Sequence, residues 1–108
     1  MTGTLELEGR VFATAVLPTA NSVILLVQGS KANLGCGYFS MAAAAKMQDR
    51  FAIARGVGNI PELLAAQVAE ASPAAEACGV KPGMNCKEAL LLMERPTDLP
   101  LKGILRKS

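Results

Sequence analysis

The chain has 108 residues, which suffice for one hydrophobic core and leave too few for a second. Apolar residues make up 51% of it and aromatic residues only 4%, so the core must be built from aliphatic and Met side chains. The absence of His excludes a Ser/His/Asp triad, and the net charge of +2, spread along the chain, argues against a nucleic-acid surface. A core so poor in aromatic residues favours self-association, because subunit contacts would bury further surface.

The first 39 residues predict an antiparallel β-meander. Residues 4–8 alternate Leu with Thr or Glu, which is the two-residue period of a half-buried strand. Residues 11–17 and the continuous apolar run 23–27 predict two more strands, separated by a Pro- and Asn-containing turn. After a short polar link with Gly29, residues 32–39 predict the fourth strand.

A strand, helix, strand unit follows the meander. Ser40 is a typical N-cap for an Ala- and Met-rich helix over residues 41–47, and the apolar run 51–54 predicts a further strand. Asn59, Ser72 and Asn85 each stand where a short helix begins. These caps predict helices over 60–64, 73–78 and 86–93, and residues 67–71 are compatible with a strand. We expect Gly79 to end the second of these helices in a left-handed conformation.

These elements predict an α+β fold, in which about four antiparallel strands precede a mixed strand and helix region with three to four short helices. We expect one domain over residues 1–95, in which 1–39 form a β-rich oligomerisation region and 40–95 form the mixed helical region. Residues 96–108 are a C-terminal tail with several apolar side chains, which would dock on the domain or on a neighbouring subunit.

The segment Gly35-Cys36-Gly37 is the densest group of special residues, because it places a thiol between two glycines just before a predicted helix. One interpretation is structural: free Cys is commonly buried, and the glycines would permit close backbone packing. The alternative is a thiol that acts as a nucleophile or binds a ligand, near a helix N-terminus that favours anions. No His exists to serve as its base.

Arg55 and Gly56 follow a predicted strand and form the second group. A guanidinium at a strand end can hold a carboxylate or phosphate through two parallel hydrogen bonds. The alternative is an ion pair with Asp49, with Glu62 or with an acidic residue of another subunit. Met41, Met47, Met84 and Met93 are interpreted as core residues.

Three cysteines, Cys36, Cys78 and Cys86, form an odd number without a Cys-x-x-Cys pair. This pattern argues against a disulfide framework and, with no His, against a zinc site, so we expect neither a metal nor a cofactor. A reducing cytoplasm fits best, and the absence of a basic leader followed by an apolar run argues against export, so we expect a cytosolic protein without a membrane partner.

Several segments together resemble one known family. They are LGCGYF at residues 34–39, AIARGV at 52–57 and IPELL at 60–64, followed by 74–75, 79–80, 83–84 and 88–90. In order and spacing they are similar to the YunC-like family, domain of unknown function 1805. The resemblance implies an N-terminal β-region used for tetramerisation and places the family's Cys-Gly and Arg-Gly-Val at Cys36-Gly37 and Arg55-Gly56-Val57. It implies no established activity.

The sequence is compatible with three functions. The first is an oligomeric assembly or small-ligand-binding module, with Gly35, Gly37, Arg55 and Gly56 as ligand-binding candidates and a small anion as the ligand. The second is a thiol-dependent enzyme that uses Cys36, with Arg55 binding an anionic substrate. The third is a regulatory or nucleic-acid-associated subunit that relies on the basic tail residues Lys102, Arg106 and Lys107, and it ranks last.

Overall fold

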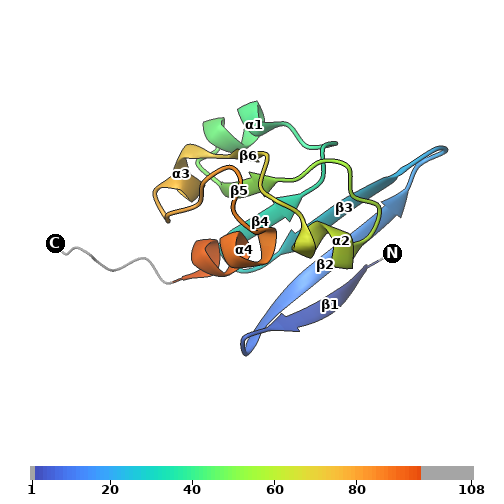
Figure 1. The fold of residues 1–108 in the computed structure, drawn as a ribbon, viewed down its shortest axis with the longest axis horizontal. Coiled ribbons are helices and arrows are strands. Elements are labelled where there is room, and N and C mark those ends of the chain that lie inside the picture. The colour runs from blue at the N-terminus through green and yellow to red at the C-terminus, as the bar shows by residue number, and fades with distance from the viewer. Residues whose placement is uncertain (1, 96–108) are drawn as a thin grey trace, which may run out of the picture.

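The computed structural model describes residues 2–95 and contains one six-stranded sheet in the order β1-β2-β3-β4-β5-β6 (Figure 1). The strands are β1 Thr2–Leu7, β2 Arg10–Pro18, β3 Val23–Gln28, β4 Ala32–Gly35, β5 Arg50–Ile53 and β6 Glu70–Ala71. The helices of this part of the chain are α1 Met41–Lys46, α2 Ile60–Ala65, α3 Pro73–Glu76 and α4 Cys86–Glu94. The predicted α+β class, with four antiparallel strands before a mixed region, is confirmed.

Successive side chains of β2 point to opposite faces of the sheet. Phe12 lies opposite Leu5 of β1 and is fully buried, and it faces the helices together with Leu25 and Val27 of β3. The alternate residues of β2, beginning with Val11, point to the other face. The β2–β3 hairpin projects beyond the helices at the right of Figure 1.

The β4–α1–β5 unit contains the one parallel pairing among the described strands. The prediction that the fourth strand reaches Phe39 is wrong, because it ends at Gly35 and the chain turns there. The Phe39 amide donates to the carbonyl of Cys36 over 3.2 Å, and the Phe39 ring folds back over Gly35. A Cβ atom at Gly35 would lie 2.5 Å from a carbon of that ring, so only glycine permits this packing.

The four predicted helix caps are all confirmed. The side-chain oxygens of Ser40, Asn59, Ser72 and Asn85 each accept a hydrogen bond from a backbone amide in the first turn of the helix that follows. Gly79 adopts the expected left-handed conformation, with φ of 98°.

The strand predicted over residues 67–71 is only two residues long. Val68 instead exchanges backbone hydrogen bonds with the loop before α4, donating to Met84 and accepting from Gly83. These bonds draw residues 67–68 away from β5 and leave only β6 to extend the sheet.

Helices α2 and α4 cover one face of the sheet and close the core (Figure 1). Leu63 of α2 and Leu90 of α4 are fully buried against the strand residues, as is Met93. Met93 is thus a core residue as expected, but the prediction for Met47 is wrong: its side chain is 70% exposed just after α1.

The end of α4 is attached to the turn between β3 and β4 by the carboxylate of Glu94. One oxygen accepts from the amide and hydroxyl of Ser30, and the other accepts from the amides of Lys31 and Ala32, over 2.8–3.0 Å. Gly29 is required beside it, because a Cβ atom there would collide with the carboxylate. This contact closes the core at the end of the sheet opposite the β2–β3 turn.

Among the described helices, none has the length and apolar character needed to cross a bilayer. The predicted tail of residues 96–108, including its apolar and basic side chains, lies outside the described residues.

Candidate functional site

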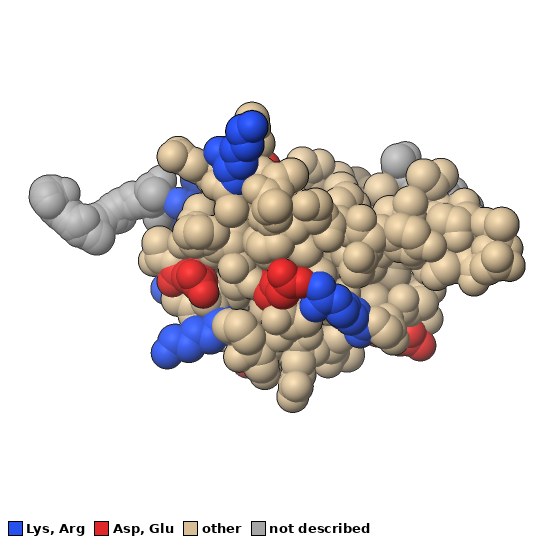
Figure 2. All heavy atoms as spheres, turned by 90° about the horizontal axis from the view of Figure 1, so that it is seen from above, with Lys and Arg blue, Asp and Glu red and all other residues tan. Residues whose placement is uncertain are grey.

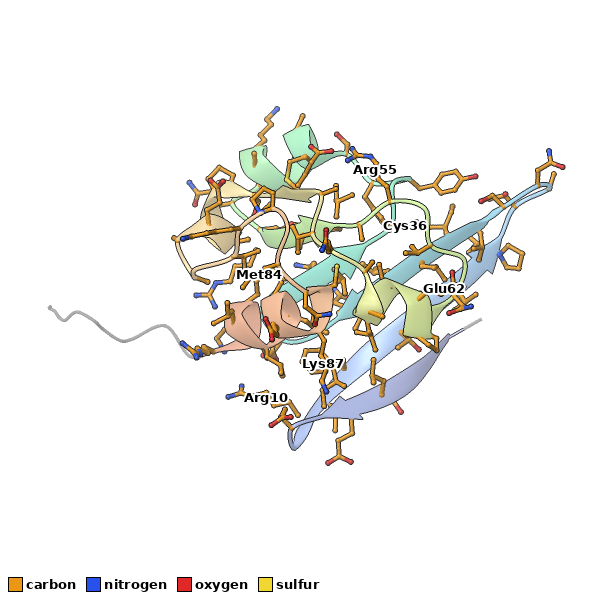
Figure 3. All side chains as sticks on the ribbon, in the orientation of Figure 1. Arg10, Cys36, Arg55, Glu62, Met84 and Lys87 are labelled. Carbon is orange, nitrogen blue, oxygen red and sulfur yellow. The ribbon has the colours of Figure 1, made fainter. Side chains whose placement is uncertain are left out.

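A cavity of about 360 Å³ lies where three segments that are distant in sequence meet. Its walls are residues 22–23 at the start of β3, 36–38 after β4 and 55–57 after β5. Because β4 and β5 are parallel neighbours, their carboxyl ends share one edge of the sheet, and the chain leaves both strands there. This arrangement brings Cys36 and Arg55 to the same part of the molecule (Figure 3).

Four of the five residues singled out from the sequence line this cavity: Cys36, Gly37, Arg55 and Gly56. The fifth, Gly35, does not line it. It lies within β4 beneath the rings of Phe39 and Phe51, whose centroids are 5.5 Å apart. Gly35 therefore has a packing role, although its carbonyl accepts from the Ala54 amide and so joins the two segments that carry the cavity.

Cys36 is almost fully buried at the inner wall, with 4% of its surface exposed. Its sulfur accepts a hydrogen bond from the Leu25 amide over 3.3 Å, and its thiol lies 3.9 Å from the Val23 carbonyl oxygen. Its own amide donates to the Leu25 carbonyl, which continues the sheet by one residue. Cys36 thus links β3 to the cavity wall, which matches the structural interpretation while leaving the thiol among the lining groups.

Arg55 lies at the outer wall, and its guanidinium forms an ion pair with Glu70 of β6. The expected partners within the chain were Asp49 and Glu62, and neither is correct. Glu62 instead accepts from the Gly58 amide over 2.8 Å, at the start of α2. Only one guanidinium nitrogen contacts Glu70, and the Arg55 side chain is 56% exposed, so its other N–H groups stay available.

The glycines beside these residues shape the backbone of the cavity. A Cβ atom at Gly37 would lie 3.4 Å from Cγ of Arg55, so the aliphatic part of Arg55 rests directly on the Gly37 backbone. Gly56 has φ of 75°, in the left-handed region that glycine adopts without strain. Together they let the two loops approach and reverse direction at the cavity.

Unpaired hydrogen-bond donors are the main chemical feature of the lining. Within residues 2–95, the backbone amides of Gly37, Tyr38, Gly56 and Val57 have no acceptor. The hydroxyl of Ser22 likewise has no partner among the described residues. Gly37, Tyr38 and Gly56 are exposed and Val57 is half-buried, so solvent can reach these amides and a ligand rich in acceptors could pair with them.

Residues missed by the sequence analysis complete the site. Ser22 and Val23 come from the β2–β3 hairpin, and Glu70 comes from β6, so only strand pairing brings them close. Tyr38 had a usable signal, since it is the single Tyr of the chain and directly follows Gly37. Its ring is 56% exposed at the rim, with its hydroxyl 3.5 Å from that of Thr19.

The described residues contain no group of three His, Cys, Asp or Glu side chains arranged to hold a metal ion. The other cysteines lie away from the cavity lining. Cys86 is fully buried at the start of α4, where burial raises the pKa of its thiol to about 11, and Cys78 is half-buried.

The family model of a domain of unknown function, DUF1805, matches residues 35–93, which is more than half of the chain. The chain belongs to this family. The match covers both loops of the cavity that follow β4 and β5, whereas Ser22 and Val23 precede it. No curated protein matches the chain.

A solved structure agrees with the fold of this DUF1805 protein. It is the crystal structure of TA1206, a protein of unknown function from Thermoplasma acidophilum, which is 28% identical in sequence. The similarity covers 86% of this chain and 91% of the other, with a TM-score of 0.82. It therefore extends beyond the region matched by the family model into the N-terminal strands.

Proposed function

We propose that this DUF1805 protein is a homo-oligomeric module that binds a small anionic ligand in the cavity around Cys36 and Arg55. The observation that carries the proposal is the gathering of a guanidinium and four unpaired backbone amides around one cavity. These groups come from two loops that the parallel pairing of β4 and β5 holds together.

The size and chemistry of the cavity support a small ligand. A volume of about 360 Å³ is at the lower end of the range found for small-molecule sites. Amides, a hydroxyl and a guanidinium are all donors, so a ligand must supply acceptors to pair them. Anions pair best with such groups, because hydrogen bonds to a charged acceptor are about twice as strong as neutral ones.

Binding is tested by titrating a panel of small anions and neutral compounds of the same shapes at constant ionic strength. We expect anions to shift the amide resonances of Gly37, Tyr38, Gly56 and Val57 in ¹H–¹⁵N spectra. Arg55→Gln should weaken this binding at least about tenfold, because it removes the charged donor. Lys81→Gln makes the same charge change at an exposed residue that does not line the cavity, and it should leave binding unchanged.

If no compound of the panel shifts these four amides, the cavity is not a ligand site and the proposal is wrong. Equal binding by the Arg55→Gln and Lys81→Gln proteins would contradict the role of Arg55.

The oligomeric part of the proposal rests on the first three strands. No charged residue occurs between Arg10 and Lys31, and no Lys, Arg, Asp or Glu is visible on the projecting end of the molecule in Figure 2. Val11 and Leu17, on the sheet face opposite Phe12, are 66% and 56% exposed. An exposed apolar sheet face is typical of a protein interface, so residues 1–39 are the proposed assembly region and a tetramer is the proposed state.

A thiol-dependent enzyme is the second candidate, because Cys36 and Arg55 line the same cavity. A nucleophilic Cys36 would react with iodoacetamide faster than the half-buried Cys78 in the folded protein, as measured by mass spectrometry of the separated peptides. We expect the reverse, because the Cys36 sulfur is covered and hydrogen-bonded to the Leu25 amide. Faster alkylation of Cys36 would favour the enzyme.

A further inference from the structure

The ion pair between Arg55 and Glu70 indicates which class of anion Arg55 can bind. Both side chains are partly exposed, by 56% and 38%, and one guanidinium nitrogen makes the contact. Ion pairs this exposed are weak, because water screens the charges and both side chains lose conformational freedom. Arg55 can therefore release the Glu70 carboxylate and bind another anion, or bind both, with little loss of free energy.

Glu70 also limits the charge of the ligand. A dianion bound at Arg55 would bring two negative charges close to the Glu70 carboxylate, with a single cation to balance them. A planar carboxylate carries one charge and matches the guanidinium with two parallel hydrogen bonds. The charge balance at this wall thus favours a monocarboxylate over a phosphate.

Two other residues of the lining are apolar. Val23 and Val57 contribute only aliphatic side chains, and the buried Cys36 lies between their segments. A short hydrocarbon chain that contacts these side chains would be removed from water, which stabilises the complex in proportion to the apolar area buried.

We infer that the ligand is a small monocarboxylate with a short apolar chain, and that Glu70 is an internal competitor for Arg55. The carboxylate pairs with Arg55 and with the free amides of Gly37 and Gly56, and the apolar chain contacts Val23 and Val57. Glu70 pairs with Arg55 in place of the ligand's carboxylate and releases Arg55 when the ligand binds. This inference rests on the proposed ligand-binding function and adds the class of ligand.

The test uses butyrate as the probe, with butyramide and inorganic phosphate as comparisons, in ¹H–¹⁵N titrations of the full chain at constant ionic strength. Butyramide has nearly the shape of butyrate without its charge, and phosphate has the charge without the apolar chain. Butyrate should shift the amides of Gly37 and Gly56 with an affinity about tenfold or more above that of either comparison.

The direction in which Glu70→Gln changes butyrate affinity tests whether Glu70 competes with the ligand. Removing the competing carboxylate should raise butyrate affinity by about two- to fivefold, the range expected from an exposed ion pair. A purely structural role for Glu70 would leave the affinity unchanged or lower it. Glu76→Gln is the matched control, because Glu76 is exposed on α3 and, unlike Glu70, forms no ion pair with Arg55, and it should have no effect.

The outcomes distinguish ligand binding by the cavity from the monocarboxylate class of the ligand. If butyramide or phosphate shifts the cavity amides as strongly as butyrate, the cavity binds ligands but the monocarboxylate class is wrong. Unchanged or weaker butyrate binding by the Glu70→Gln protein, with a native-like spectrum, overturns the competitor role. If none of the three probes shifts these amides, the class is wrong, and the wider panel of anions decides the function itself.

Discussion

Glu94 illustrates how a single carboxylate can organise segments far apart in sequence. Its side chain accepts four hydrogen bonds from the turn between β3 and β4 while only 8% of its surface is exposed. Burial by itself raises the pKa of this carboxyl, but the hydrogen bonds from residues 30–32 outweigh burial and hold the pKa below its ordinary value of 4.5. The ionised form is therefore part of the folded structure.

We expect Glu94→Gln to destabilise the protein by about 2–4 kcal/mol at neutral pH, because an amide cannot accept all four bonds and its NH₂ group faces donors. Since the folded pKa lies below the unfolded one, the contribution of Glu94 is complete above pH 4.5 and is lost as the pH falls through the folded value. Urea denaturation at several pH values measures both effects.

Glu88→Gln is the control for this variant, because Glu88 is exposed on the same helix and its amide form still suits the first turn. The difference in stability between the Glu94→Gln and Glu88→Gln proteins should shrink between pH 7 and pH values below 4.5. A difference that stays constant with pH would contradict the assigned role of the charge.

At the scale of elements, the helix starts were the most predictable features. Ser, Asn and neighbouring residues determine a cap through bonds that span three residues, so the pattern is visible in a short window of sequence. A short stretch of sequence does not show the contacts that Ser72 makes with distant residues. Its buried hydroxyl also accepts from the Phe51 amide over 3.0 Å and donates to the Asp49 carbonyl over 2.6 Å, which ties α3 to β5.

Ser72→Ala should therefore cost more than the loss of a cap alone. We expect about 2–4 kcal/mol, because the amide of Phe51 and the carbonyl of Asp49 lose a partner in a region with little water. Ser40→Ala removes an exposed cap with a longer contact of 3.5 Å and should cost about 1 kcal/mol or less. Similar losses in the two variants, measured by urea denaturation, would show that the additional bonds of Ser72 contribute nothing.

At the scale of the whole molecule, the projecting strands present an apolar face that the helices leave uncovered. If this face is the assembly region, the protein should sediment as a tetramer, at about four times the chain mass of 11.2 kDa. Val11→Asp should lower this mass without unfolding the chain, because Val11 is already exposed in the monomer. The new charge also lies opposite Glu6 of β1, where a like-charge pair costs up to about 1 kcal/mol, so the larger effect falls on the contact between subunits.

Met47→Asp serves as the control, because Met47 is equally exposed but lies after α1, outside the first three strands. It should leave the sedimenting mass unchanged. A wild-type chain that sediments as a monomer would refute the oligomer, and a Met47→Asp protein that dissociates like Val11→Asp would relocate the interface.

The strands and helices of the structure were largely readable from the chain, because alternation, caps and glycine turns act over a few residues. For the same reason the sequence indicated Cys36, Gly37, Arg55 and Gly56 as a group worth following. It could not indicate that they share one cavity, since that depends on the parallel register of β4 and β5.

Contacts between distant segments were decided only by tertiary structure. Glu70, and not Asp49 or Glu62, pairs with Arg55 because β6 lies beside β5 and presents Glu70 at the end of that strand. β4 ends at Gly35, where the ring of Phe39 folds back over the strand. Charge and residue type restrict which partners are suitable, but the register of the strands selects one of them, and that register is set by burial over the whole core.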